Sequence, residues 1–338
     1  MVSGSLKEYG YIKKVITRVL SEDCRTSITE LSKKIGISRN SVRKYLLQIE
    51  KEFKPKYTIE LDKNLLKIAN RHFVVAKFKN RPSEKELKEI TEKDINIQIA
   101  AITKGDFDAF FYLEAIEGNE YTEAENRLSV SLSKFTPTIS PSYITSLQTG
   151  FLPSSEAFIK KALGASETKE VDLKIILELM NNARESYREI SKKVGISEDS
   201  VRYRTFRLKE MGLIKRFTMA YMSPPLNHVF CALFNYVFSQ DIGFKAAKAR
   251  NAYFDQESEL GIQNKYNLLV SMTGSYRFMM FVSGETTENA LEIGVMKHKS
   301  IFGNSISSSA CAEVKKIVKG YLPIRNIDLK KDYKQIKV

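Results

Sequence analysis

Cysteine, histidine and long apolar runs are scarce in this sequence, and each shortage excludes a class of protein. The 338 residues include three cysteines, Cys24, Cys231 and Cys311, which are far apart and form no Cys-x-x-Cys or Cys/His cluster. This spacing argues against a disulfide framework and against a zinc site, and it fits a reducing interior. No apolar run approaches the roughly 18 residues of a membrane helix, and the N-terminus lacks a signal-peptide pattern. We therefore expect a cytoplasmic protein that has no membrane partner and holds no metal or other cofactor.

Catalytic patterns are missing as well. The sequence has no glycine-rich phosphate loop and no Ser/His/Asp arrangement. Its three histidines, His72, His228 and His298, are widely separated. We therefore expect a binding protein with no catalytic residues.

Positive charge is what the sequence has in excess. Lys and Arg number 54 against 40 Asp and Glu, which gives a formal net charge of +14 at pH 7. Residues 1–57 are the most concentrated positive segment, with 13 basic and 6 acidic side chains. Because Lys and Arg that neutralise phosphates release counterions, this charge favours a polyanionic partner. A Lys-rich chain that is merely soluble is the other interpretation, and composition alone leaves both open.

A repeat is the strongest signal in the chain. Residues 30–43 return 159 positions later as residues 189–202, with ten of fourteen residues identical. The chain therefore carries one functional unit twice.

In the second copy the repeated unit has the signals of a helix-turn-helix. Ser186 is a plausible N-cap with Glu189 as its capping-box partner, and the helix should stop at Gly195, where a turn can use a positive φ. Ser197 then caps a third helix of about fourteen residues. Residues 212–221 are β-prone and basic, as the wing of a winged helix would be.

The first copy repeats this plan with a helix at residues 12–20, a cap and capping box at Ser27 and Glu30, a turn at Gly36 and a second cap at Ser38. Two inward stripes are expected on the third helices: Val42, Leu46 and Ile49 in the first copy, and Val201, Thr205 and Leu208 in the second. The remaining polar side chains should face outward and contact duplex DNA through phosphates or bases. These candidates are Ser38, Asn40, Ser41, Arg43, Lys44, Gln48, Ser197, Ser200, Arg202, Tyr203, Arg204 and Arg207. Arg202, Arg204 and Arg207 could instead be solvated or paired with Asp199 or Glu210, and the two serines at the caps serve the helix ends first.

Each unit is followed by a segment with the order strand, helix, strand, strand, helix, strand. In the first copy the predicted strands lie near residues 72–79, 95–103, 109–115 and 140–147, with helices at 83–91 and 122–135. In the second copy they lie near residues 229–238, 266–272, 278–283 and 310–318, with helices at 243–255 and 288–299.

Residues 171–214 resemble the helix-turn-helix signature of the Lrp/AsnC transcription regulators in residue type, spacing and order, and the first copy resembles it more loosely. The resemblance implies an α+β fold in which two winged helix-turn-helix domains alternate with two ferredoxin-like βαββαβ sandwich domains. The expected domains are residues 1–60, 61–165, 166–224 and 225–338. Because single-copy relatives dimerise through the sandwich, the tandem chain is expected to form a pseudo-dimer within itself, and a homodimer of chains stays open.

The resemblance also implies a ligand. The family's Gly-x-Tyr/Phe-Asp hallmark matches Gly105 to Asp108, whereas the second copy has Gly274 and, in place of the aspartate, Arg277. Gly105 and Asp108 are therefore candidate binding residues for an amino acid effector. The simpler interpretation is that the glycines are hairpin residues and that Asp108 finishes the turn.

Three functions compete at this point. The first is a sequence-specific transcription regulator whose two different recognition helices favour an asymmetric site. The second is an enzyme, because siroheme decarboxylases are built like Lrp/AsnC proteins. The third is a chromatin-like architectural protein that coats DNA with little sequence preference.

Overall fold

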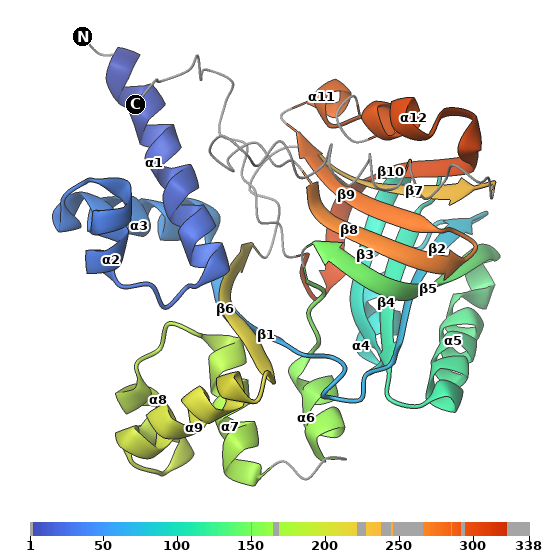
Figure 1. Ribbon diagram of the computed structural model, residues 1–338. Coiled ribbons are helices and arrows are strands. Elements are labelled where there is room, and N and C mark those ends of the chain that lie inside the picture. Colours follow the sequence, from blue (N-terminus) through green and yellow to red (C-terminus); the bar gives the residue numbers. More distant parts are fainter. Residues whose placement is uncertain are drawn as a thin grey trace.

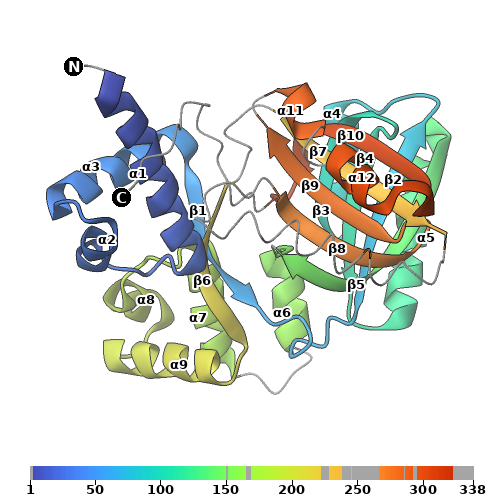
Figure 2. The ribbon, with the colours of Figure 1, turned by 45° about the horizontal axis from the view of Figure 1, so that its top comes forward.

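The computed structural model describes residues 3–149, 151–164, 169–221, 228–237, 245, 266–284, 286–291 and 295–322. Figure 1 shows two groups of helices on one side of the molecule and a barrel of strands on the other, with strands β1 and β6 between them. The 45° rotation in Figure 2 keeps the helical groups together and clear of the barrel. None of the helices in the described ranges is both long and apolar enough to cross a membrane.

The two helical groups are the predicted helix-turn-helix units. The first consists of α1 (Ser3–Glu22), α2 (Ile28–Ile35) and α3 (Arg39–Phe53), and the second of α7 (Glu170–Asn181), α8 (Tyr187–Val194) and α9 (Glu198–Glu210). Both predicted capping boxes are present, since Ser27 and Ser186 each exchange hydrogen bonds with the glutamate three residues later. Helix α1 begins well before the predicted residue 12.

The strands that follow the recognition helices pair with each other. β1 (Pro55–Leu61) and β6 (Ile214–Tyr221) form an antiparallel two-stranded sheet, with Thr58 opposite Thr218. The predicted β-structure after residue 212 is therefore present, but among the described residues the strand forms no separate hairpin wing. Its partner is the equivalent strand of the other copy, because each strand alone would leave its backbone groups unpaired.

The rest of each copy follows the predicted order of strands and helices. The first copy contains β2 (Asn70–Phe78), α4 (Glu84–Glu92), β3 (Ile97–Gly105), β4 (Ala109–Ala115), α5 (Gly118–Leu132) and β5 (Pro137–Thr149). A short 3-10 turn, η1 (Ser133–Phe135), precedes β5, and α6 (Glu156–Gly164) leads toward the second copy. The second copy contains β7 (His228–Tyr236), β8 (Tyr266–Gly274), β9 (Phe278–Gly284), α11 (Thr287–Leu291), α12 (Lys297–Phe302), η4 (Gly303–Ser305) and β10 (Ile306–Lys319). The predicted helix at 243–255 lies outside the described residues, apart from residue 245, and the one predicted at 288–299 is described as two shorter helices.

The strand order confirms the ferredoxin-like prediction. The first sheet has the order β5-β2-β4-β3, and the second has the equivalent order β10-β7-β9-β8. The two sheets then join edge to edge, β3 with β10 and β5 with β8, both antiparallel, so the eight strands close into one barrel. Closure leaves none of these eight strands as a free edge.

A shared hydrophobic core fills the inside of this barrel. Phe73, Phe110 and Phe281 meet there with ring centroids 5.0 to 6.2 Å apart, so aromatic rings from both copies pack together. Helices α4 and α5 cover the outside of the first sheet, where Leu87 and Leu128 are buried. The apolar alternation of the strands thus supplies one face to the shared core and the other to the helices.

Candidate nucleic-acid interface

The turns before the two recognition helices, α3 and α9, have matching geometry. Gly36 and Gly195 adopt φ values of 76° and 79°, a left-handed conformation that glycine adopts without steric cost. Ser38 and Ser197 then cap the following helices by accepting from the backbone N–H groups of Ser41 and Ser200. The local sequence therefore sets the angle between the helices of each unit, and both recognition helices start at exposed N-termini.

The predicted inward stripes are confirmed in both copies. Val42, Leu46 and Ile49 on α3 are buried, as are Val201, Thr205 and Leu208 on α9. Burying these stripes orients each helix, so the opposite face is presented to solvent.

The predicted DNA-contacting residues differ in their exposure to solvent. Arg43 and Arg202 occupy equivalent positions and are both exposed. Arg202 forms an exposed ion pair with Glu198 one turn earlier, at 3.1 Å, and its guanidinium lies 5.9 Å from the centroid of the Tyr187 ring. The other exposed candidates are Ser38, Asn40, Lys44, Ser197, Tyr203 and Arg207. Ser41, Gln48 and Ser200 are half-buried. Exposed ion pairs of this kind are weak, so Arg202 remains able to contact phosphate.

The prediction that Arg204 faces freely outward is wrong. Its side chain is 27% exposed, and Nη1 donates to Oδ1 of Asp172 on α7 at 2.9 Å. The pair links the recognition helix to the first helix of its own unit. Arg204 therefore positions α9, and sequence spacing did not reveal the link because Asp172 lies 32 residues away.

Two apolar side chains on the outer face were missed from the sequence. Leu47 is 66% exposed and Phe206 is 60% exposed, although both are large and hydrophobic. Each lies one helical turn after the exposed arginine of its own helix, on the same face. The repeat contained a signal for them, because aligning the two copies places Leu47 opposite Phe206, outside both inward stripes.

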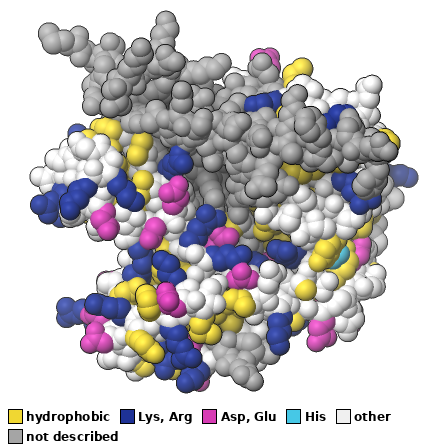
Figure 3. Space-filling view, in the orientation of Figure 1, with side chains coloured by type: hydrophobic (Ala, Val, Ile, Leu, Met, Phe, Trp, Pro, Cys, Tyr) yellow, Lys and Arg dark blue, Asp and Glu magenta, His cyan; other side chains and the backbone are white. Residues whose placement is uncertain are grey.

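Basic side chains continue beyond the recognition helices. Figure 3 shows Lys and Arg along the outer edge of both helix-turn-helix units, with acidic side chains among them. In the second unit Lys193 contacts Glu178 at 2.9 Å and Glu185 at 2.6 Å, and these hydrogen bonds raise the pKa of the lysine to about 12. The interface is thus positive overall, but some of its cations are already paired.

The tentative effector residues lie at a join between the two sheets. A side chain at Gly105 would meet the carbonyl oxygen of Cys311 on β10 at 2.4 Å, so only glycine allows this approach. The buried Asp108 carboxylate contacts Lys77 at 3.3 Å and Arg81 at 2.6 Å, and it accepts from the Phe78 N–H at 2.9 Å. An ammonium group would have to displace one of those cations.

The second copy makes the same turn without an aspartate. The N–H of Asp108 donates to Ala76, and the N–H of Arg277 donates to Phe234, both at 2.9 Å. The turn therefore does not depend on the carboxylate.

Comparisons with known proteins place both helical units in one family. The winged helix-turn-helix DNA-binding family matches residues 6–52 and 169–215, one match on each unit. An uncharacterized HTH-type transcriptional regulator of Pyrococcus furiosus is 31% identical over 101 residues, which cover 30% of this chain and 68% of that protein. The chain belongs to the Lrp/AsnC family. Another relative, the HTH-type transcriptional regulator Ptr1 of Methanocaldococcus jannaschii, is 53% identical over 47 residues, covering 14% of this chain and 32% of Ptr1. The match thus spans only a third of that Lrp/AsnC-like regulator.

A solved structure extends the comparison to both copies at once. The siroheme decarboxylase NirDL aligns over 92% of this chain and 93% of its own, with a TM-score of 0.56 and 12% identity. This likeness shows that the whole two-copy architecture recurs in another protein. At 12% identity this likeness shows a shared fold and does not show a shared activity.

Proposed function

We propose that this chain is a sequence-specific transcription regulator that reads double-stranded DNA with two different recognition helices. The observation that carries the proposal is the pair of helices α3 and α9, which share caps and inward stripes but differ on their outer faces. Matching caps aim both helix N-termini outward, where backbone N–H groups and the helix dipole favour phosphate. Family membership agrees with this function.

The outer faces differ at several equivalent positions. Lys44, Leu47 and Gln48 on α3 correspond to Tyr203, Phe206 and Arg207 on α9. A duplex bound by both helices would therefore meet two different sets of side chains. The preferred site should be asymmetric, unlike the palindromes of symmetric dimers.

We further propose that the chain does not share the activity named for NirDL. Each of the three histidines contacts another side chain of the protein. His72 stacks on Tyr121, His228 lies 2.7 Å from Glu313, and His298 lies 2.6 Å from the Tyr236 hydroxyl. Burial lowers the pKa of His72 to about 4 and that of His298 to about 3, so neither ring is the charged imidazolium acid near neutral pH. Incubation with siroheme followed by absorption spectroscopy tests this point, and decarboxylation of the pigment would refute it.

The DNA test begins with selection of bound duplexes from a random pool. A regulator should enrich one asymmetric sequence and bind it at least roughly a thousandfold more tightly than unrelated duplex at physiological salt. Equal affinity for both would instead support the architectural, DNA-coating interpretation.

Two variants then test the helix assignment. Arg43→Ala and Arg202→Ala should each weaken binding and flatten the plot of log affinity against log salt by roughly one unit. Lys85→Gln removes one charge from a side chain that is 87% exposed, on helix α4 of the barrel, and should change neither quantity. Identical slopes for all three variants would contradict the interface.

A further inference from the structure

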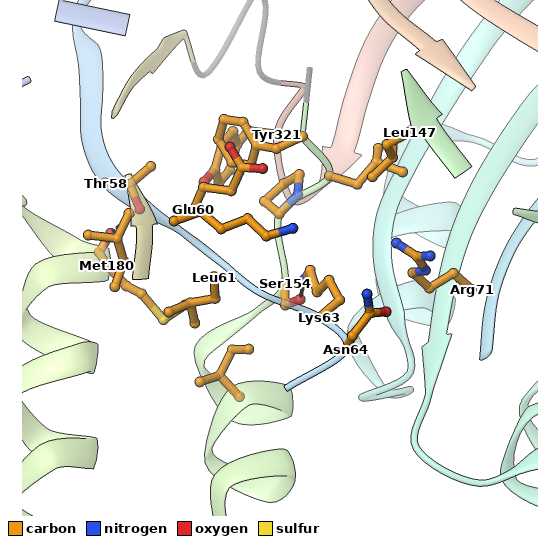
Figure 4. Close-up of a pocket in the computed structure, with 16 residues that line it drawn as sticks. Thr58, Glu60, Leu61, Lys63, Asn64, Arg71, Leu147, Ser154, Met180 and Tyr321 are labelled. Atoms are coloured by element: carbon orange, nitrogen blue, oxygen red, sulfur yellow. Dashed lines mark hydrogen bonds between the residues drawn. The ribbon is translucent and has the colours of Figure 1, made fainter. Parts of the chain in front are cut away.

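A pocket lies between the two-stranded sheet of β1 and β6 and the eight-stranded barrel (Figure 4). One side is formed by β1, the turn after it and Lys215 of β6, and the other by Arg71 of β2, Leu147 of β5 and the segment that leads to α6. Figure 4 shows Lys63 and Ser154 on one side of the pocket, and Arg71 and Leu147 on the side of the barrel strands. The pocket contains no residue of α3 or α9, so it is separate from the proposed DNA interface.

A buried carboxylate contacts two of the residues that line the pocket, Lys63 and Ser154. Glu114 on β4 is fully buried and accepts a hydrogen bond of 2.5 Å from the Tyr112 hydroxyl. Lys63 pairs with the same carboxylate at 2.8 Å, and Ser154 donates to it as well. The charges of Glu114 and Lys63 therefore neutralise each other. A ligand in the pocket would meet no net charge from this pair.

The cations of the pocket are not all satisfied in this way. Lys63 is committed to Glu114, and Lys215 pairs with Asp62 at 3.0 Å. Arg71 differs, because its Nε is buried and has no hydrogen-bond partner among the described residues. No described carboxylate lies within ion-pair distance of Arg71 either. A buried charged donor without a partner is costly, so an anion that reached this guanidinium would be bound favourably.

The second copy shows that the fold does not need this charged group. β4 and β9 are equivalent strands of seven residues, and Tyr112 and Glu114 correspond to Phe281 and Ser283. β2 and β7 are equivalent strands of nine residues, and Arg71 corresponds to Val229. The same strands thus form without the arginine and the buried glutamate. Because taking charged groups out of water costs free energy even when they are paired, the presence of Arg71 and Glu114 in one copy alone points to a task other than folding.

We propose that this pocket binds a small carboxylic acid with an apolar carbon chain. The planar guanidinium fork of Arg71 matches the geometry of a carboxylate, and one uncommitted cation balances a single negative charge. Leu147, Phe151 and Leu152 line the pocket and supply apolar contact for the carbon chain. A ligand here would touch both the sheet that joins the helix-turn-helix units and the barrel.

The test uses the full chain without DNA, so its result does not depend on the proposed function. Three probes with related carbon skeletons are titrated by calorimetry and thermal shift: 4-methylpentanoate, its neutral amide 4-methylpentanamide, and leucine, which adds an ammonium group. We expect the carboxylate to raise the melting temperature and the amide to leave it unchanged. Binding of 4-methylpentanoate should weaken at least tenfold in Arg71→Gln and stay as in the wild type in the charge-matched control Lys85→Gln.

Folding is checked in parallel. The unliganded Arg71→Gln variant should melt as a single transition, and Arg71→Lys, which keeps the charge but loses the fork, should bind with intermediate affinity. If neither 4-methylpentanoate nor any straight-chain carboxylate from pentanoate to octanoate raises the melting temperature, the proposal is overturned. Equal binding of 4-methylpentanoate by Arg71→Gln and the wild type would overturn it as well. Leucine binding that survives Arg71→Gln and disappears in Asp108→Ala would place the ligand site at the Gly105 turn and also refute the proposal.

Discussion

Thr58 and Thr218 lie opposite each other in the two-stranded sheet, and each hydroxyl donates a hydrogen bond to the first helix of the other copy's helix-turn-helix unit. Thr58 donates to the carbonyl of Met180 at 2.9 Å, and Thr218 donates to the carbonyl of Ser21 at 2.6 Å. Both bonds are buried. The two units are therefore held to each other by reciprocal contacts around a pseudo-two-fold axis.

Replacing either threonine by valine should destabilise the protein by about 1–3 kcal/mol, because a buried carbonyl loses its donor while the side-chain shape is kept. Urea unfolding of Thr58→Val and Thr218→Val measures the loss. Thr122→Val on α5 is the matched control, since Thr122 is exposed. If the three variants have the same free energy of unfolding, the reciprocal bonds contribute nothing.

Gly105→Ala should cost about 2–4 kcal/mol and loosen the join between β3 and β10. The added Cβ would lie 2.4 Å from the Cys311 carbonyl oxygen, on a residue whose φ is +152°. Thermal unfolding detects the loss. Gly164→Ala, at the end of α6 with no atom within 4 Å of the new Cβ, should leave the melting temperature unchanged or raise it slightly. Equal effects of the two substitutions would argue against a tight join.

Stability should fall as the pH drops below 6.5, in part because of His298. Its ring is packed among Phe234, Phe278 and Phe302, and burial lowers its pKa to about 3. Between pH 6.5 and 3 the unfolded chain takes up a proton that the folded chain does not. This histidine can therefore contribute a loss of up to about 1.4 kcal/mol per pH unit within that range, and none above it. Urea unfolding at several pH values should give a shallower dependence for His298→Gln. A dependence identical to that of the wild type would contradict this assignment.

Leu47 and Phe206 should contact thymine methyl groups if the recognition helices enter the major groove, because an exposed apolar side chain there has that group as its natural partner. Replacing one thymine of the selected site by deoxyuridine removes only the methyl group. At a contacted position we expect a threefold to fivefold loss of affinity, the value of about 0.8 kcal/mol per buried methyl. The loss should vanish in Leu47→Ala for one half of the site and in Phe206→Ala for the other. Losses that persist in both variants would contradict the contact.

Dividing the chain between residues 164 and 169 should yield halves that associate. Each half alone exposes the edges of β3 and β5, or of β8 and β10, and the apolar face that fills the barrel. Mixed in equal amounts, they should form a one-to-one complex in sedimentation experiments. Separate halves that remain monomeric and fail to combine would show that the joins are weak.

The local parts of this structure could be predicted from the sequence because their causes are local. Ser186, Glu189 and Gly195 specify a capped helix and its end within ten residues, and the inward stripes follow from helical spacing. The order of strands and helices was likewise readable from alternation and turns.

The contacts that define the candidate sites are long-range, and the spacing of residues in the sequence does not predict them. Arg204 pairs with Asp172, Lys63 pairs with Glu114, and Lys63 and Arg71 line one pocket although they come from different segments. The pairing of β1 with β6 depends on the fold of the whole chain, since each strand alone fits a wing equally well. Such outcomes are set by tertiary packing, which local propensity does not determine.

Covalent linkage of the two copies changes what a single mutation does. In a dimer of identical chains every substitution appears at both symmetry-related positions, so a charge useful at one place must be tolerated at the other. Here Glu114 stands where the second copy has Ser283, and Asp108 where it has Arg277, so each codon alters one side of the barrel only. Each half of the molecule is therefore free to acquire its own chemistry while the other preserves the shared architecture.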